Sequence, residues 1–398
     1  MSRVLSIDVM RGAALVGMVI VHFVVYYGDH SATGTWPYFL VNHALGDWGA
    51  AAFLMLMGMS QVLSAEKRSG GPALELKRAL VRGGFLFLVG LLMLAVTWGP
   101  ARIWQWDILT MMGTMTVVVF FCRFAPSVLL IAGSLVIALA SPWLRRNVDF
   151  EAAWGGPFIQ VPVISDAFPG ILLDPSGAFQ VIWTVPDVVR GFLFAGEFPL
   201  FPWALFPVVG VVIGRRVVRG RIAGDLPLLA IIGGLLVCLG LGGAWASLLR
   251  PSSVVRDFLS PLSIYPDSFT MIAVQLGMSL LVFTGFSAWF DRPGRDPAKA
   301  GPVVRACSRA SRSSLTFYFL HYLLLGWPLA IVHLFRGRPA VAALLGVWPS
   351  LAAGLAAVVL LQGLLVVWER RQGRFSLEWW LAALSPASPS ASGSAQRL

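Results

Sequence analysis

The sequence is poor in charged residues, in cysteine and in metal-binding patterns. Asp, Glu, Lys and Arg make up 12% of its 398 residues, and it has only three cysteines and five histidines. Cys122, Cys238 and Cys307 are too widely spaced for a disulfide framework or a zinc site. No two histidines are four residues apart, as they are in a helical zinc site, and no glycine-rich phosphate loop is present. We therefore expect buried free thiols and no metal.

What the sequence has in excess is apolar residues. Hydrophobic residues make up 57% of the chain, and the mean hydropathy is +0.78. The formal net charge of +11 does not indicate a nucleic-acid partner, because the basic residues sit in short loops between apolar runs and are not interleaved with aromatics. The composition predicts an all-α, polytopic bundle of membrane helices surrounded by lipid bilayer.

Ten apolar runs are long enough to cross a bilayer, whose core of about 30 Å takes about 20 helical residues. They lie near 7–27, 48–64, 80–98, 106–122, 126–144, 198–217, 226–248, 269–290, 314–334 and 341–368. With both termini in the cytoplasm, most Lys and Arg residues fall in inner loops, as the positive-inside rule requires. We expect one transmembrane domain over 1–384, a packed outer cap at about 145–197, and a disordered cytoplasmic tail at 385–398.

The first apolar run, SIDVMRGAALVGMVIVHF, carries costly polar side chains. Asp8, Arg11 and His22 share one helical stripe, in which Arg11 and His22 are roughly 16 Å apart along the axis. They interrupt the run, so we expect a retained helix and not a cleaved signal peptide. Charged groups at membrane depth usually face a protein interior or a cavity and carry function. Two structural alternatives stay open: His22 can join two helices by a hydrogen bond, and Asp8 can neutralise Arg11.

Other histidines give weaker signals. His43 lies four residues before Asp47, a spacing that suits a general base and its orienting carboxylate if the segment is helical; a solvated loop histidine is the alternative. His321 lies in the ninth run, within SSLTFYFLHYLLL, and there we favour a packing role. His30 and His333 have no neighbours that suggest chemistry.

Arginines cluster at 78–82, 215–221 and 305–312. Such clusters mainly determine topology, but paired guanidinium groups also match the geometry of phosphate. Arg11 could likewise meet a phosphate or carbonyl group that enters from the cytoplasm. The sequence thus leaves room for an anionic cytosolic ligand.

Several stretches carry a resemblance to a known family. SIDVMRGAALVGMVIVHF resembles the opening helix of the transmembrane acyltransferase superfamily, especially the bacterial relatives of heparan-alpha-glucosaminide N-acetyltransferase. GEFPLFPWALFPVVGVVIGRR (196–216) and SLTFYFLHYLL (314–324) look like further motifs of that family, and RFSLEWWL (374–381) is similar to a motif of a neighbouring family. The resemblance implies transfer of an acetyl or other acyl group from cytosolic acyl-coenzyme A to an acceptor beyond the membrane, an amino sugar or a glycan amine or hydroxyl.

The resemblance also implies site residues. It places the catalytic histidine in the first outer loop, ahead of an Asp that opens the next helix, and here these are His43 and Asp47. The spacing of Arg11 and His22 instead matches a sister family that has an essential histidine at that place, so both histidines are candidate bases. The candidate residues for binding the acyl-coenzyme A are Arg11, Arg78, Arg82, Arg215, Arg312 and His321. The same analogy implies a bacterial plasma membrane as the location and a possible homodimer.

Two other classes of function stay open. Intramembrane Arg and His also suit a secondary transporter or flippase, in which they would bind substrate or relay protons. A structural membrane partner without catalysis is the third interpretation. Binding of acyl-coenzyme A distinguishes the enzyme from the carrier, and replacement of both His22 and His43 by Ala tests the structural interpretation.

Overall fold

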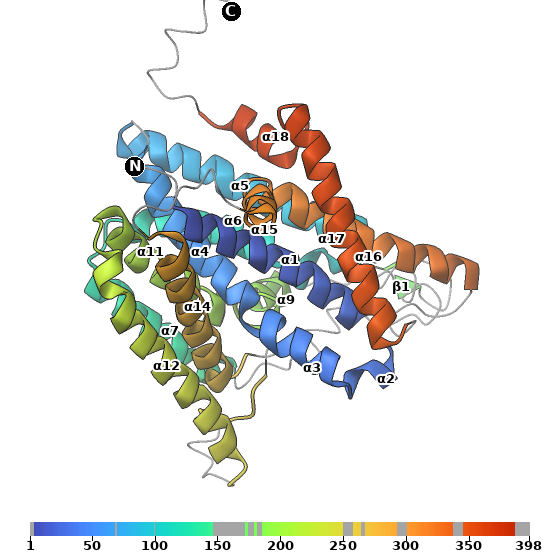
Figure 1. Cartoon of the computed structure of the whole chain (residues 1–398), viewed down its shortest axis with the longest axis horizontal. Coiled ribbons are helices and arrows are strands. Elements are labelled where there is room, and N and C mark those ends of the chain that lie inside the picture. The colour runs from blue at the N-terminus through green and yellow to red at the C-terminus, as the bar shows by residue number, and fades with distance from the viewer. Residues whose placement is uncertain are drawn as a thin grey trace, which may run out of the picture.

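The computed structural model describes residues 4–67, 70–98, 100–145, 172–173, 179–180, 185–249, 258–263, 267–292, 301–336 and 345–386. Its elements form a bundle of helices (Figure 1). In chain order the elements are α1 (Leu5–Tyr27), α2 (His30–Thr33), α3 (Trp36–Val41), η1 (Asn42–Gly46), α4 (Asp47–Glu66), α5 (Pro72–Trp98), η2 (Pro100–Gln105), α6 (Ile108–Cys122), α7 (Ser127–Arg145), β1 (Leu172–Leu173), β2 (Phe179–Gln180), α9 (Val185–Arg190), η3 (Gly191–Ala195), α10 (Leu200–Trp203), α11 (Leu205–Val218), α12 (Ile222–Ser247), α14 (Phe269–Phe290), α15 (Pro302–Arg312), α16 (Ser314–Arg336), α17 (Val347–Arg370) and α18 (Leu377–Leu384).

The predicted fold class is confirmed. Among the described residues, nine helices are long and apolar enough to cross a membrane. The predicted run at 106–122 is helical too, but its helix α6 is shorter, with 15 residues. It begins late because the side chain of Asp107 caps it by accepting a hydrogen bond from the Leu109 N–H at 2.9 Å. β1 and β2 form a short antiparallel pair.

Helix α1 lies at the centre of the bundle. It contacts α4, α14, α15, α16 and α17, so most of its side chains are buried although its sequence would suit a lipid-facing helix. The hydroxyl of Tyr27 fixes the C-terminal end of α1 by donating to the Leu325 carbonyl of α16 at 2.9 Å. This central position explains why polar residues are tolerated in α1: they face protein and not lipid.

Helices α4 and α11 approach each other closely because glycine faces backbone on both sides. A Cβ atom added to Gly58 would lie 2.0 Å from the Pro207 carbonyl oxygen, and one added to Gly210 would lie 2.1 Å from the Met55 carbonyl oxygen. Small residues that let helix backbones meet are typical of membrane bundles. This contact holds α4, which supplies several residues of the site, against the core.

The periphery of the bundle is apolar. Val128 on α7, Leu235 on α12 and Val359 on α17 have exposed fractions of 77%, 65% and 72%. Large apolar side chains on the outside of long apolar helices are what a surrounding bilayer requires. The chain is therefore a multi-pass membrane protein.

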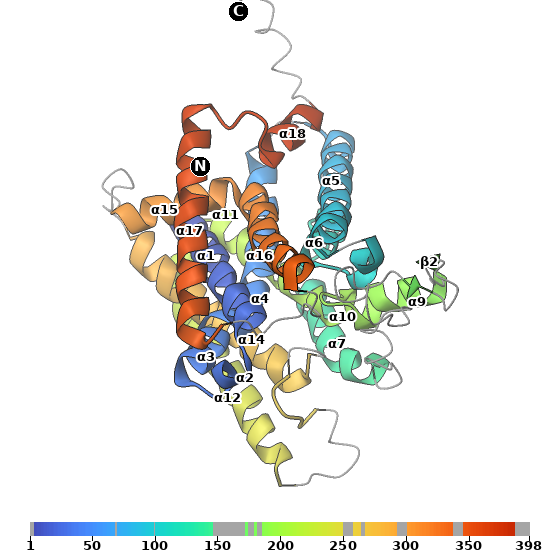
Figure 2. The same ribbon diagram turned by 90° about the vertical axis from the view of Figure 1, so that its right-hand side faces the viewer.

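The helices alternate in direction between two ends of the bundle. The beginning of α5 lies with α18 at one end, whereas α2 and α3 lie at the other (Figure 2). Ion pairs hold the first end together: Arg123 at the end of α6 pairs with Glu75 at the start of α5 at 2.5 Å, and Arg309 pairs with Glu369 at 2.8 Å. We call this the basic end. It is the end that the positive-inside rule assigns to the cytoplasm.

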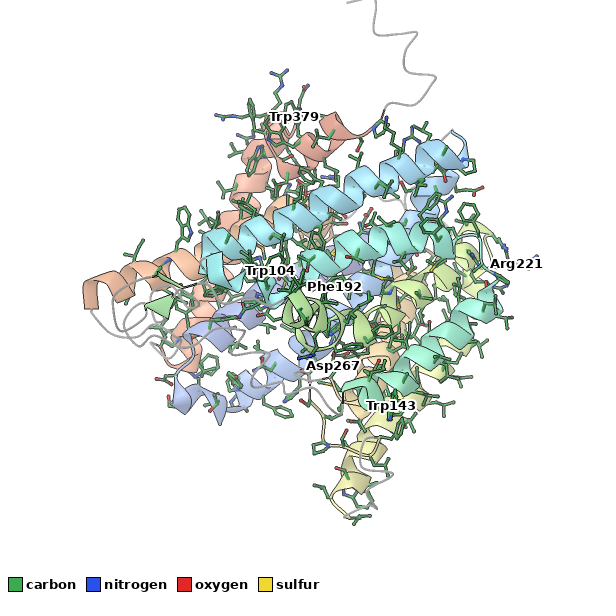
Figure 3. All side chains as sticks on the ribbon, turned by 180° about the vertical axis from the view of Figure 1, so that it is seen from behind. Trp104, Trp143, Phe192, Arg221, Asp267 and Trp379 are labelled. Atoms are coloured by element: carbon green, nitrogen blue, oxygen red, sulfur yellow. The ribbon has the colours of Figure 1, made fainter. Side chains whose placement is uncertain are left out.

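Two predicted segments lie largely outside the described residues. Of the expected outer cap at about 145–197, the structure describes β1, β2, α9, η3 and the residues that follow η3. Figure 3 shows Phe192 of η3 near Trp104 of η2, and the ring of Trp106 packs between them, with centroid distances of 4.9 and 5.3 Å. Of the expected tail at 385–398, only 385 and 386 are described.

Candidate functional site

Two cavities meet inside the bundle. The larger, of about 750 Å³, is the arginine cavity; it opens at the basic end, and its charged lining residues are Arg11, Arg78, Arg82, Arg312 and Glu378. The smaller, of about 210 Å³, is the histidine cavity, whose polar lining residues are His22, Tyr26, Asn42, Asp47, Gln275 and Tyr318. Phe53 and Tyr318 line both cavities. The arginine cavity therefore lies next to the cavity that His22 lines, with Phe53 and Tyr318 in the walls of both.

A side recess of about 280 Å³ widens the basic end. It shares Arg11, Arg78 and Arg82 with the arginine cavity and adds Arg123 and Glu75. Guanidinium groups in such a recess suit a ligand that carries several phosphates, because each group can donate two parallel hydrogen bonds.

Three helices supply the arginines, and their neighbours fix them. Arg78 of α5 is only 6% exposed, and its Nε donates to the Pro386 carbonyl at 3.2 Å. Arg11 of α1 donates to the hydroxyl groups of Ser60 and Ser311. The hydroxyl of Ser311 in turn donates to Asp8 at 3.1 Å.

Glu378 of α18 anchors the start of α16 beside this cavity. Its Oε1 accepts hydrogen bonds from the backbone N–H groups of Leu315 and Thr316 at 2.7 and 3.0 Å. These N–H groups have no partner within the helix, and a carboxylate there also complements the helix dipole. The contact docks the RFSLEWWL segment onto the helix that carries His321.

The histidine cavity contains a pair of imidazoles. His22 Nδ1 lies 3.0 Å from His321 Nε2, and His321 Nδ1 contacts the Tyr318 carbonyl oxygen. Because a carbonyl oxygen can only accept, His321 carries its proton on Nδ1 when neutral, and its Nε2 is an acceptor. His22 must then donate from Nδ1, which leaves the lone pair of His22 on Nε2. This tautomer follows from the hydrogen-bond pattern.

His321 itself is fully buried, whereas His22 is partly exposed. The ring of Tyr322 packs on both, with centroid distances of 5.4 Å to His22 and 4.4 Å to His321. His321 therefore orients His22 and shields it from one side. The sequence prediction that favoured a packing role for His321 did not place it beside His22.

A buried carboxylate supports the same helix. Asp107 is 0% exposed, and its Oδ2 accepts hydrogen bonds from the hydroxyl groups of Tyr318 and Tyr322 at 2.7 and 3.5 Å. Tyr318 thus has a fixed side chain where the two cavities meet. A rigid second layer of this kind is what keeps a reactive group in place.

The second predicted pair also forms. His43 Nδ1 lies 2.5 Å from Asp47 Oδ2, with side chains that are 48% and 12% exposed. The π-helical turn η1 leads directly into α4, so Gly46 does not interrupt the helix. Asp47 lines the histidine cavity, but His43 is not among the described residues that line it. Its ring packs on Phe39 instead, at a centroid distance of 4.3 Å.

Arg215 lies apart from the arginine cavity. Its guanidinium donates to the carbonyl groups of Cys122, Arg123 and Ala125 at 2.9, 2.9 and 2.7 Å, and to the Ser127 hydroxyl at 3.0 Å. It closes the turn between α6 and α7. Arg312 lines the cavity and also pairs with Glu369.

Sequence reasoning missed three residues of the site: Asp107, Tyr318 and Gln275. Asp107 stands at the start of an apolar run, which is a signal of a buried carboxylate or a cap. Tyr318 is one helical turn before His321 in a motif already singled out. Gln275 is an isolated amide within an apolar helix, and such residues mark interior contacts. Among the described residues, no three His, Cys, Asp or Glu side chains are grouped as metal ligands.

Fold and site together define a multi-pass helical membrane protein in which an arginine-lined cavity adjoins a second cavity that is lined by an oriented imidazole. The sequence model of the family described as heparan-alpha-glucosaminide N-acetyltransferase, catalytic, matches residues 3–240. The chain belongs to this family, which makes it a transmembrane transferase of the acetyltransferase type. Residues after 240, including α16 with His321, lie beyond the match. No curated protein matches the chain.

Proposed function

We propose that the protein transfers an acetyl group from acetyl-coenzyme A, bound at the basic end, to an amine or hydroxyl group in the histidine cavity. The observation that carries the proposal is that the arginine cavity adjoins the cavity lined by His22, with Phe53 and Tyr318 in the walls of both. The arginines suit the phosphates of coenzyme A. The basic end would face the cytoplasm of a bacterial cell, and the acceptor would enter from the other side.

His22 is the base in this mechanism. Its Nε2 removes the proton of the acceptor as the acceptor oxygen or nitrogen forms a bond to the thioester carbon, and the carbonyl electrons move onto oxygen. The intermediate then breaks its C–S bond, and the Nε2 proton of His22 passes to the leaving thiolate. The products are the acetylated acceptor and free coenzyme A, and His22 returns to its starting tautomer.

The protein also controls the surroundings of this step. His321 holds Nδ1 of His22 in its donor state, so Nε2 is ready before the acceptor arrives. Much of the wall of the histidine cavity is apolar, including Leu15, Phe198 and Trp203. A mostly apolar enclosure limits competing hydrolysis of the thioester by water.

His22 is preferred over His43 because of where each ring lies. His22 lines the cavity that adjoins the arginine cavity, whereas the ring of His43 is half-exposed and packs on Phe39. The His43–Asp47 pair therefore supports the wall of the cavity through Asp47. This assigns the catalytic base to α1 and a positioning role to His43.

The test uses purified protein with His22→Gln and His43→Gln as a matched pair of variants. Acetyl-coenzyme A binding is measured by calorimetry, and transfer of radiolabelled acetyl groups is measured with glucosamine as the acceptor. Removal of a general base costs about 10²- to 10⁴-fold in rate, so His22→Gln should lose that much and still bind the donor. A larger loss in His43→Gln would assign the base to His43. Failure of the wild type to bind acetyl-coenzyme A would overturn the proposal and favour a carrier.

A further inference from the structure

An open groove lies where α17 turns into α18, at the basic end of the bundle (Figure 2). Its volume is about 700 Å³, and its charged lining residues are Arg370, Arg371 and Arg374. Leu364 and Val367 of α17 are among its apolar lining residues. The described residues that line this groove all differ from those that line the arginine cavity. The proposed acetyl transfer therefore does not use it.

The positive charge of the three groove arginines is not balanced by the protein. Glu369, their nearest acidic neighbour in the sequence, pairs with Arg309 and Arg312, and Glu378 accepts hydrogen bonds from the start of α16. Within the described ranges, no carboxylate pairs with a groove arginine. Three guanidinium groups in one groove attract an anion, and their paired N–H groups match the oxygens of a phosphate.

An exposed apolar stripe leads along α17 to these arginines. Leu360, Leu364 and Val367 are 51%, 39% and 49% exposed, and their spacing of four and three residues places them on one helix face, which Arg371 continues. Leu360 and Arg371 are eleven positions apart, which is about 16 Å along a helix axis. This length is close to half of the hydrocarbon core, which is about 30 Å thick. The stripe thus has the length of one leaflet, with cations at one end.

The turn that carries the arginines is held in place by its own hydrogen bonds. The indole N–H of Trp368 donates to the Arg374 carbonyl at 2.8 Å, and the Gly373 N–H donates to the Trp368 carbonyl at 2.9 Å. Gln372 and Phe375 have positive φ angles of 56° and 66°, which residues with side chains rarely adopt. The backbone thus presents the groove in a fixed shape.

Aromatic side chains surround the turn on the α18 side. Phe375, Trp379 and Trp380 are 70%, 36% and 47% exposed, and the ring of Trp379 packs on both of the others. Trp379 is labelled in Figure 3. Exposed tryptophans next to arginines are typical of the level at which lipid headgroups meet water. The groove therefore lies at the depth of a phospholipid headgroup.

We propose that this groove is a binding site for one anionic phospholipid. Its phosphate accepts hydrogen bonds from Arg371 and Arg374, and its acyl chains lie along Leu360, Leu364 and Val367. A zwitterionic lipid fits less well, because its ammonium group would meet unbalanced guanidinium groups. A free phosphate or nucleotide would use the arginines but leave the apolar stripe without a partner.

The experiment titrates the detergent-purified full chain with phosphatidylglycerol and counts bound lipids by native mass spectrometry. The wild type should bind one phosphatidylglycerol at least about 10-fold more tightly than phosphatidylcholine. Arg371→Gln with Arg374→Gln should lose about 10-fold or more of this affinity, because hydrogen bonds to a charged group are removed. The matched control is Arg219→Gln with Arg221→Gln, two exposed arginines on the turn between α11 and α12, and it should bind as the wild type does.

Thermal unfolding gives a second readout on the same proteins. Phosphatidylglycerol should raise the melting temperature of the wild type and of the control, but not that of the groove variant, because a ligand stabilises only a state that binds it. Inorganic phosphate, soluble glycerophosphoglycerol and acetyl-coenzyme A should not displace the lipid. Equal losses in the two double variants, equal affinity for phosphatidylcholine, or displacement by any of these soluble anions would overturn the proposal.

Discussion

Replacement of His321 tests whether the imidazole pair acts as a unit. The His321→Ala variant removes the acceptor that lies 3.0 Å from His22 Nδ1. His22 is then free to rotate and to place its proton on Nε2, the nitrogen that must take the proton of the acceptor. The variant leaves the arginine cavity unchanged, because His321 is not among the described residues that line it.

The expected loss follows from the hydrogen bond. A buried hydrogen bond whose removal leaves a donor unsatisfied is worth about 1–3 kcal/mol, which corresponds to about 5- to 150-fold in rate. We expect this loss in kcat, with the KM for acetyl-coenzyme A unchanged. The assay is steady-state transfer of labelled acetyl groups by detergent-purified protein, with thermal unfolding measured on the same samples.

The double variant sharpens the test. If His321 acts only through His22, His22→Ala with His321→Ala should be no slower than His22→Ala alone, because residues that act as a unit are not additive. If His321 had only a structural role, His321→Ala should lower the melting temperature and should reduce kcat by the same factor whether or not His22 is present. A folded His321→Ala variant with wild-type kcat, or additive losses in the double variant, would refute the reasoning.

Further predictions concern the cavities and the helix contacts. Arg82→Ala should weaken acetyl-coenzyme A binding by about 10- to 100-fold, as expected for lost hydrogen bonds to a charged group; calorimetry measures this, and unchanged affinity would remove Arg82 from the donor site. Phe53→Trp should narrow the junction that both cavities share and abolish transfer while donor binding persists; full activity would place the path elsewhere. Gly58→Ala should lower the free energy of unfolding by about 1–3 kcal/mol, because the added methyl group overpacks against the α11 backbone; a lower melting temperature would show this. Gly363→Ala is the control, since an added Cβ there meets nothing within 4 Å, and it should leave the melting temperature unchanged. Equal effects of the two variants would contradict the close contact of α4 with α11. Burial raises the pKa of the Cys307 thiol on α15, so iodoacetamide should modify this thiol much more slowly in folded protein than in denaturant. Peptide mass spectrometry measures the two rates, and equal rates would mean that Cys307 is accessible.

The sequence predicted the helices better than the site. Long apolar runs bounded by polar residues are almost sufficient to predict membrane helices. Lipid offers the backbone N–H and C=O groups no hydrogen-bond partner, so these groups must pair within a helix. Helix α6 is shorter than the predicted run at 106–122 because the side chain of Asp107 caps its first turn. Such capping depends on a local side-chain contact that hydropathy does not show. The sidedness of the termini stays a prediction based on the positive-inside rule.

The site could be predicted only where spacing along one helix was sufficient. The stripe from Arg11 to His22 and the His43–Asp47 pair are local, so helical periodicity revealed them. The contact between His22 and His321 joins residues almost 300 positions apart, and nothing in one sequence shows which membrane helices are neighbours. The same holds for Asp107 and Tyr318, and for the position of Arg215, which lies in a basic cluster but caps a turn.

The central claim is that a donor bound at the basic end reaches His22 through the protein and serves an acceptor from the opposite side. The most direct measurement uses sealed proteoliposomes with glucosamine trapped inside, acetyl-coenzyme A labelled in the acetyl group added outside, and the protein inserted with its basic end outward. Labelled N-acetylglucosamine should appear in the lumen while coenzyme A stays outside, and Phe53→Trp should stop it. Transfer only when both substrates share one side, or entry of intact acetyl-coenzyme A into the lumen, would contradict the account.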